Sequence, residues 1–336
     1  MMHTARINFR LKFLNFLFFV GKTGGFLVLL ILAGAGFSKK NLEKLPEGNS
    51  GIAALYSDDE NIINHPEVIF ADDFDDYSIV RDLSKSWDVQ INDEYLNIDD
   101  SCSLNHEGKS LKMTVPKRNE PLATGVSVLL QEKLDVLFLR WYMKFDEGWS
   151  IPNASVHNGA SISADYFEDG NATPGIRANG QNKFLVNFEN ENSAGKSPGN
   201  MNAYVYWPEQ GERWGDHFFP SGKVLPYSSE RSGNKTFGKH FISRPDFSSE
   251  TGRWYCYEYM VKANTPAKRD GRIVLWIDGK IIADFTNLRL RDVEKLKIDR
   301  FGLGLYIANN AVRTNHKWHD NVVAATSYIG PKINLK

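Results

Sequence analysis

The segment Ile273-Val-Leu-Trp-Ile-Asp278-Gly279-Lys-Ile-Ile decides the fold class. It places Asp-Gly between two runs of apolar residues. Asp-Gly is a preferred pair for a tight hairpin turn because both central residues can take positive φ. The segment therefore predicts two antiparallel strands joined by a short turn.

The chain around this hairpin repeats the same kind of pattern. From Val68 onward, short apolar or alternating runs rich in Val, Ile, Phe, Tyr and Trp are separated by Gly, Asn, Asp and Pro. The expected strands are Ser110–Val115, Gly125–Gln131, Leu137–Phe145, Lys183–Glu189, Asn202–Trp207, Arg253–Ala263, Arg272–Ile277, Lys280–Phe285, Arg300–Ile307 and Asn321–Tyr328. No long segment has helical periodicity, and the best helical candidate, Leu288–Leu296, is short. The sequence predicts one all-β domain, an antiparallel two-sheet sandwich.

Composition excludes several classes of protein. The 336 residues include 40 Lys+Arg and 41 Asp+Glu, a net charge of -1, whereas a nucleic-acid binder normally carries a basic excess. With 42% hydrophobic residues the chain is globular in composition. Two cysteines cannot build a disulfide scaffold or a four-thiolate zinc site. Cys102 and Cys256 either form one disulfide or remain separate thiols, and the sequence leaves both alternatives open.

The N-terminus has the pattern of an export segment. A basic start precedes two apolar runs, and the second run contains Ala33-Gly-Ala35, a small-x-small pattern that suits a signal peptidase. We expect cleavage and secretion, with an uncleaved membrane tether through residues 11–37 as the alternative. The expected organisation is a signal peptide or membrane anchor over 1–37, a polar linker over 38–66 and the β domain over 67–331.

Strand alternation and loop composition indicate candidate binding residues. Several strands pair a core face with a polar and aromatic face, which is either a solvated surface or a concave face that binds sugar. On such faces lie Arg140, Tyr142, Lys144, Asn187, Glu189, Tyr204 and Tyr206. Long connections rich in Trp, His and Arg add His157, Arg177, Trp214 and His217.

Acidic residues open the first and last strands. Asp73 lies in an Asp-rich stretch and Asp320 follows Trp318-His319. Carboxylate and carbonyl oxygens from two adjoining strand ends are suitable ligands for calcium. A structural calcium ion and a solvated acidic turn are the two interpretations.

Five elements carry a family resemblance. They are the Asp73-Phe74 start, Arg140-x-Tyr-x-Lys144, the strand from Gly252 to Asn264, the Leu275–Lys280 hairpin and the closing Asp320-Asn321-Val-Val. Over residues 67–331 the chain resembles the concanavalin A-like lectin/glucanase superfamily. Within it, the chain is most similar to the β-jelly-roll polysaccharide lyases and their uncharacterised secreted relatives. This resemblance implies a jelly roll that holds an extended polysaccharide on its concave face.

The resemblance also implies a reaction, β-elimination of a uronate-containing polysaccharide. In such lyases a basic or amide group neutralises the carboxylate, a second group takes the neighbouring proton, and a third protonates the leaving oxygen. Candidates for neutralisation are Arg140, Arg177 and Asn187; for the base, His157 or His217; for the proton donor, Tyr204 or Tyr206. Lys144 would bind a second carboxylate, and Tyr142, Glu189 and Trp214 would contact substrate.

Other functions have less support from the sequence. The Glu-x-Asp-x-x-Glu spacing of a retaining glucanase is absent, so a hydrolase ranks below a lyase. A non-catalytic sugar-binding module remains the main alternative. A lyase needs a His or Tyr beside the Arg or Asn of one pocket, whereas a lectin does not. We expect a secreted or membrane-tethered monomer that acts on polysaccharide and uses no catalytic cofactor.

Overall fold

The computed structural model describes residues 44–104, 106, 108–191, 195–225, 231–232 and 234–333. Leu45–Lys336 forms one compact unit. The predicted export or anchor segment, residues 1–37, lies outside the described residues. Within the described ranges, no helix has the length and apolar character that a membrane crossing requires.

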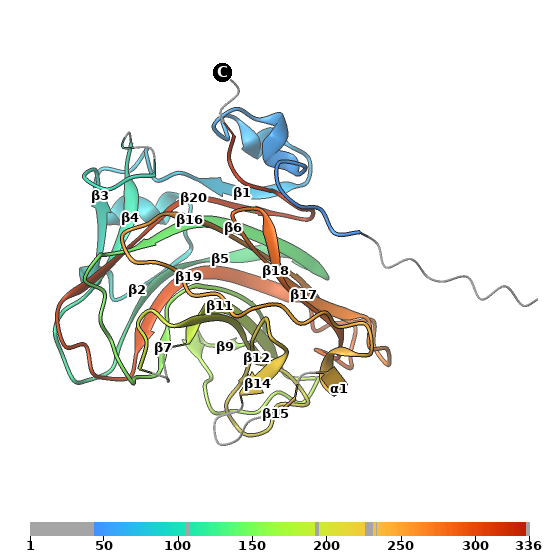
Figure 1. The fold of residues 1–336 in the computed structure, drawn as a ribbon. Helices are drawn as coiled ribbons and strands as arrows, with labels where there is room; N and C mark the ends of the chain where they lie inside the picture. Colours follow the sequence, from blue (N-terminus) through green and yellow to red (C-terminus); the bar gives the residue numbers. More distant parts are fainter. Residues whose placement is uncertain are drawn as a thin grey trace, which may run out of the picture. The chain divides into compact units, whose positions relative to one another are not determined.

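Two antiparallel sheets pack face to face (Figure 1). In spatial order the first sheet contains β18 (Lys280–Leu288), β17 (Gly271–Ile277), β16 (Tyr255–Lys262), β6 (Val136–Phe145), β20 (Asn315–Ala325), β4 (Ser110–Val115) and β3 (Leu96–Asp99), with β1 (Val68–Asp72) beside β20. The second contains β15 (Arg231–Ser232), β14 (Lys223–Leu225), β13 (Asp216–Phe218), β12 (Asn200–Tyr206), β11 (Phe184–Glu191), β8 (Ala160–Ala164), β19 (Ile298–Ile307), β5 (Leu122–Leu134) and β2 (Val89–Ile91), with β7 (Val156–His157) beside β19. The predicted all-β two-sheet sandwich is confirmed.

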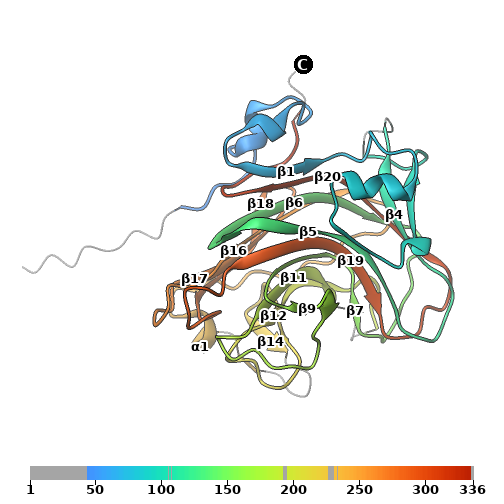
Figure 2. The same cartoon turned by 180° about the vertical axis from the view of Figure 1, so that it is seen from behind.

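Outside these sheets, the described residues form a small hairpin, several short helical elements and long connecting loops (Figure 2). A small hairpin pairs β9 (Phe167–Glu168) with β10 (Asn171–Ala172). The helical elements of the described ranges are short: η1 (Ile52–Leu55), η2 (Ile62–Asn64), η3 (Val80–Lys85), η4 (Asp93–Tyr95) and α1 (Asn234–Phe237). The helical candidate Leu288–Leu296 is wrong, because β18 extends to Leu288 and no helix follows it there.

The Asp-Gly turn has the expected geometry. Asp278 has φ 49° and Gly279 φ 73°, so both central residues are left-handed, and Ile277 pairs with Lys280 across the turn. The turn joins β17 to β18, as predicted. The last strand differs from the prediction, because β20 begins at Asn315 rather than at Asn321. Its first half carries Lys and His on a buried face, which hid it from a search for apolar alternation.

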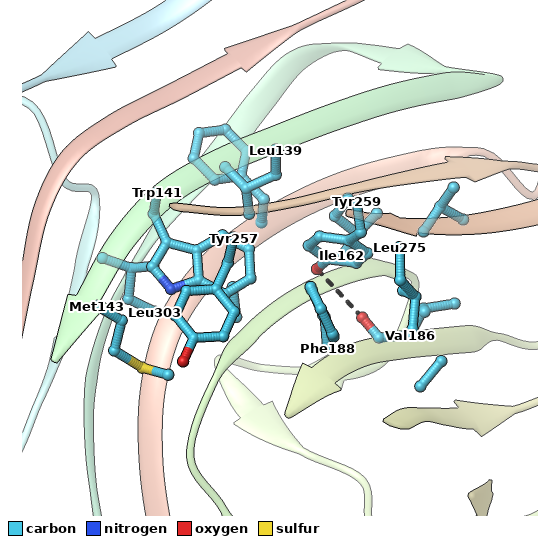
Figure 3. Packing of buried hydrophobic residues seen from close by; sticks show 14 of the residues in the cluster. Leu139, Trp141, Met143, Ile162, Val186, Phe188, Tyr257, Tyr259, Leu275 and Leu303 are labelled. Carbon is cyan, nitrogen blue, oxygen red and sulfur yellow. Dashed lines mark hydrogen bonds between the residues drawn. The ribbon is translucent and has the colours of Figure 1, made fainter. Parts of the chain in front are cut away.

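Aromatic residues of both sheets fill the interior (Figure 3). The indole of Trp141 on β6 stacks on the ring of Tyr257 on β16, with centroids 5.3 Å apart. Tyr259 donates its buried hydroxyl to the carbonyl oxygen of Val186 at 3.3 Å, a bond that crosses from the first sheet to the second. This bond satisfies a polar group that would otherwise destabilise the core.

The polar stretch predicted as a linker over 38–66 is folded in its described part. Ile52, Ala53 and Ile62 are buried in a cluster with residues of the first sheet. Asp59 forms a 2.5 Å ion pair with Arg140 on β6. Few apolar residues mark this segment, so its composition gave little sign that it packs on the sheet.

Candidate functional site

Strand register aligns four polar residues on the non-core face of the second sheet. Asn187 on β11 lies between Ser161 on β8 and Tyr204 on β12, and Tyr204 lies opposite His217 on β13. Their sequence neighbours point into the core, because side chains alternate along a strand. We call this non-core surface of the second sheet the site face.

His157 and Glu189 form a close pair on the site face. His157 reaches this face because β7 pairs with β19, with His157 opposite Tyr306. Its Nδ1 lies 2.9 and 3.0 Å from the two carboxylate oxygens of Glu189, which is 0% exposed, whereas His157 is 30% exposed. The Asn187 amide also donates to Glu189, at 3.2 Å. Because a carboxylate accepts, Nδ1 of His157 carries a proton and Nε2 faces away from Glu189.

Tyr204 lies between two histidines. Its ring centroid is 4.7 Å from that of His157 and 4.7 Å from that of His217. His217 donates from Nδ1 to the Asn202 amide oxygen at 2.9 Å. The Asn202 nitrogen donates to the Glu189 carbonyl at 3.2 Å, which fixes the amide orientation. Both imidazoles therefore keep Nδ1 bonded to an oxygen. The Tyr204 ring lies beside both of them, and its hydroxyl accepts a bond from the Gly215 amide at 3.0 Å.

The surroundings shift the pKa values of His157, His217 and Tyr204 in different ways. Burial acts to lower the pKa of His157, but the charge and hydrogen bond of Glu189 outweigh it, so the pKa is raised. Burial, helped by the charge of His157, lowers the pKa of His217 to about 3. Burial, helped by Tyr206, raises the pKa of Tyr204. Near neutral pH, Tyr204 is therefore protonated and His217 is neutral, while His157 holds its proton more strongly than a free imidazole.

Tyr206 begins a second polar cluster further along the site face. Its hydroxyl accepts a bond from the Gly175 amide at 3.0 Å, and its ring lies 5.2 Å from Tyr166. The Lys183 ammonium lies 5.0 Å from the Tyr206 ring and donates to Thr173 Oγ1 at 2.8 Å. Burial lowers the pKa of Lys183 to about 8. Lys183 was not among the predicted site residues.

Two predicted loop residues lie near this second cluster. Arg177 is exposed and donates to the Gln210 carbonyl at 2.7 Å. The Trp214 ring lies close to Gly175, where an added Cβ would be 3.2 Å from it. These contacts place both residues at the Tyr206 end of the site face, and not beside His157.

Arg140, Tyr142 and Lys144 lie elsewhere, which corrects their predicted place beside the histidines. They share the non-core face of the first sheet, on the opposite side of the sandwich. Arg140 is fully buried against Asp59, and the Tyr142 hydroxyl accepts a bond from the Lys332 amide at 2.8 Å. The Lys144 ammonium lies 5.8 Å from the Trp318 ring. Alternation predicted that the three share a face, but it cannot tell to which sheet a strand belongs.

The two aspartates of the predicted calcium site already have protein partners. Asp320 accepts backbone N–H bonds from Leu104 at 2.8 Å and Asn321 at 2.7 Å. Asp73 accepts one from Asp75 at 3.2 Å. Over the described ranges, no three His, Cys, Asp or Glu side chains gather in a way that could hold a metal ion. These donors do not fit a calcium ligand set, and calcium stays a prediction from sequence.

The two cysteines are separate thiols. Cys102 is partly exposed and Cys256 is buried on β16. Of the two alternatives that the sequence left open, the structure has the unpaired one.

Comparison with known proteins relates part of the chain to a lyase family. Residues 171–306 match the model of the family described as polysaccharide lyase 14. The resemblance to the jelly-roll polysaccharide lyases is confirmed. The matched range contains Asn187, Glu189, Tyr204, Tyr206 and His217, whereas His157 lies before it. This match supports the prediction of a polysaccharide lyase.

Solved lyase structures share the fold. Alginate lyase Aly36B has a TM-score of 0.55 and 17% identity, and the match covers 78% of this chain and 98% of that one. The PL-14 alginate lyase from Aplysia kurodai has a TM-score of 0.53 and 13% identity, covering 77% and 99%. No curated protein matches this chain in sequence.

Sequence reasoning missed three neighbours of the predicted residues. Asn202 and Tyr306 alternate with core residues on β12 and β19, so the face assignment that found Tyr204 would have found them too. Lys183 precedes β11 and contacts Tyr206 only through the fold. Alternation along the predicted strand Lys183–Glu189 puts Lys183 on the face of Asn187 and Glu189, but its contact with Tyr206 depends on strand pairing.

Proposed function

We propose that the chain cleaves a uronate-containing polysaccharide by β-elimination on the site face. The observation that carries this proposal is the His157–Glu189 pair beside Tyr204, with an asparagine in the same cluster. This is the arrangement that separates a lyase from a lectin, since a lectin needs no proton-transfer groups.

His157 is the proposed base. Nε2 of its neutral ring can accept the proton beside the uronate carboxylate, and the imidazolium that forms is stabilised by Glu189 at 2.9 Å. A raised pKa makes His157 a stronger base than a free imidazole. His217 is less suited, because its pKa of about 3 gives little driving force for proton abstraction.

Tyr204 is the proposed proton donor. Its raised pKa keeps the hydroxyl protonated at working pH. Transfer of this proton to the leaving glycosidic oxygen completes the cleavage of the carbon–oxygen bond, while the abstracted proton stays on His157. The adjacent rings, 4.7 Å apart, allow the proton on His157 to return to the tyrosinate, directly or through solvent.

Asn187 is the proposed ligand of the uronate carboxylate. One N–H of its amide donates to Glu189 at 3.2 Å, which leaves the second N–H for a substrate oxygen. A donor there stabilises the negative charge that develops on the carboxylate when the neighbouring proton leaves. His157 and Asn187 would thus act on adjacent atoms of one sugar.

Alginate is the first substrate to test. A mutant of Aly36B, which shares this fold, was solved with an alginate tetrasaccharide. We further propose that the protein acts outside the cytoplasm, either released or tethered through residues 11–37. The basic start and the apolar runs of the sequence support this location.

The test is a lyase assay on the full chain with alginate, glucuronan, ulvan, pectin and glycosaminoglycans. Elimination creates a conjugated unsaturated uronate, so we expect a rise in ultraviolet absorbance on at least one polymer. His157→Ala and Tyr204→Phe should abolish the rise. Folded protein that binds one of these polymers but gives a flat trace on all of them would instead be a binding module.

A further inference from the structure

A buried lysine of the first sheet contacts the second sheet beneath the site face. Lys317 on β20 is 0% exposed, and so are the neighbouring inward residues of the strand, Asn315 and His319. Its ammonium donates to the carbonyl oxygens of Asn158 at 2.8 Å and Gly304 at 2.6 Å. Burial lowers the pKa of Lys317 well below its ordinary value. A buried amine is costly unless it is hydrogen-bonded, so these two bonds are what make Lys317 tolerable in the interior.

The two carbonyls lie where strand pairing is interrupted. β19 pairs with β7 at Tyr306 and His157, and with β8 from Leu303 and Ala160. Between the two strands the chain bends at Gly159, where an added Cβ would lie 1.8 Å from the Phe188 carbonyl oxygen. Lys317 therefore donates to the carbonyl of Asn158, the residue directly after His157, and to that of Gly304 on the neighbouring strand β19.

The same bend is tied to Glu189. The side-chain oxygen of Asn158 accepts a bond from the Asn190 amide at 2.9 Å. Asn158 follows His157, and Asn190 follows Glu189. The backbone of Asn158 is therefore held by Lys317, while its side chain holds the strand that carries Glu189.

We propose that Lys317 is a positioning residue that sets the contact between His157 and Glu189. The proposal rests on the proposed function, in which that contact prepares the base. Lys317 touches no substrate and acts through the bend at Asn158. The titratable groups that interact with it electrostatically are Glu189 on β11 and His319 on β20.

The experiment compares Lys317→Met with Arg291→Met. Arg291 is a matched control, because it is also a buried cation that donates to backbone carbonyls, those of Asn264 at 2.8 Å and Leu296 at 3.0 Å. It contacts none of the proposed catalytic residues through those bonds. For each variant, NMR gives the pKa of His157, and steady-state kinetics give kcat and KM.

We expect Lys317→Met to lower the pKa of His157 toward its ordinary value, because a looser contact with Glu189 withdraws the interaction that raises it. We expect kcat to fall about 100-fold, as for a misplaced catalytic group, with KM within about twofold of wild type. Arg291→Met should change neither the pKa of His157 nor kcat.

Other results would overturn the proposal. A raised or unchanged pKa of His157 in Lys317→Met would contradict positioning, because a looser contact with Glu189 can only lower that pKa. Equal effects in Arg291→Met would indicate general destabilisation. If Lys317→Met does not fold, Lys317→Gln, which can still donate to one carbonyl, should show the same lowered pKa to a smaller extent, and no change would count against the proposal. If the wild type is inactive but Lys317→Met still lowers the pKa of His157, the proposed lyase reaction is contradicted and the positioning role is not.

Discussion

Nδ1 of His157 lies 2.9 Å from Oε1 and 3.0 Å from Oε2 of Glu189. Glu189 is fully buried while His157 retains access to solvent, so the carboxylate affects substrate through the groups bonded to it, the His157 imidazole and the Asn187 amide. This contact with Glu189 is the reason why His157, on the surface of a sheet, is a candidate base.

Replacing the Glu189 carboxylate should make His157 a weaker base. We expect Glu189→Gln to lower kcat by about 100-fold or more, because the amide no longer stabilises the imidazolium. Glu209→Gln is the matched control, since Glu209 pairs with Arg269 away from the histidines. Steady-state kinetics on the responsive polymer check the prediction, and near-normal turnover in Glu189→Gln would contradict it.

The pH dependence follows from the raised pKa of His157. A base must be unprotonated, so kcat/KM should rise with pH through the pKa of His157 in the free enzyme. The midpoint should lie above about 6.5, the ordinary histidine value. In Glu189→Gln it should move to lower pH. A pH profile whose acid limb is the same in both proteins would rule out His157 as the titrating base.

Tyr204→Phe should separate chemistry from binding. The variant keeps the ring between the histidines and removes only the hydroxyl, so we expect kcat to fall about 100-fold with little change in KM. Tyr142→Phe is the control, because Tyr142 lies on the other sheet, where its hydroxyl accepts the Lys332 amide bond. Comparable losses in the two variants would argue against a donor role for Tyr204.

Arg140 should matter for stability and not for turnover. Arg140→Met leaves the Asp59 carboxylate buried without its partner, which should lower the free energy of unfolding by about 3 kcal/mol or more. The double variant with Asp59→Asn should recover part of this loss. Denaturant unfolding measures both values, and KM should stay at the wild-type level. A raised KM in folded Arg140→Met would contradict this prediction and indicate that Arg140 binds substrate.

The sequence predicted local features better than distant ones. Asp278-Gly279 specified a turn, and alternation correctly separated Trp141 from Arg140, because both depend on neighbours along the chain. Which strands form one surface depends on sheet order, so Arg140 was placed beside the histidines although it lies on the other sheet.

Lys317 shows most clearly what could not be predicted from the sequence. A lysine in a strand normally indicates the solvent face, yet Lys317 points inward, where carbonyls at the bend after His157 accept its bonds. The carbonyls of Asn158 and Gly304 belong to residues that lie 159 and 13 positions from Lys317 along the chain. No local sequence pattern contains such contacts.

The central claim is that the chain breaks its substrate by elimination and not by hydrolysis. Mass spectrometry of the products formed in water enriched in heavy oxygen tests it most directly. We predict unsaturated fragments that absorb ultraviolet light and contain no oxygen from water, formed by the wild type and not by His157→Ala. Saturated fragments that carry the heavy oxygen would show hydrolysis and contradict the account.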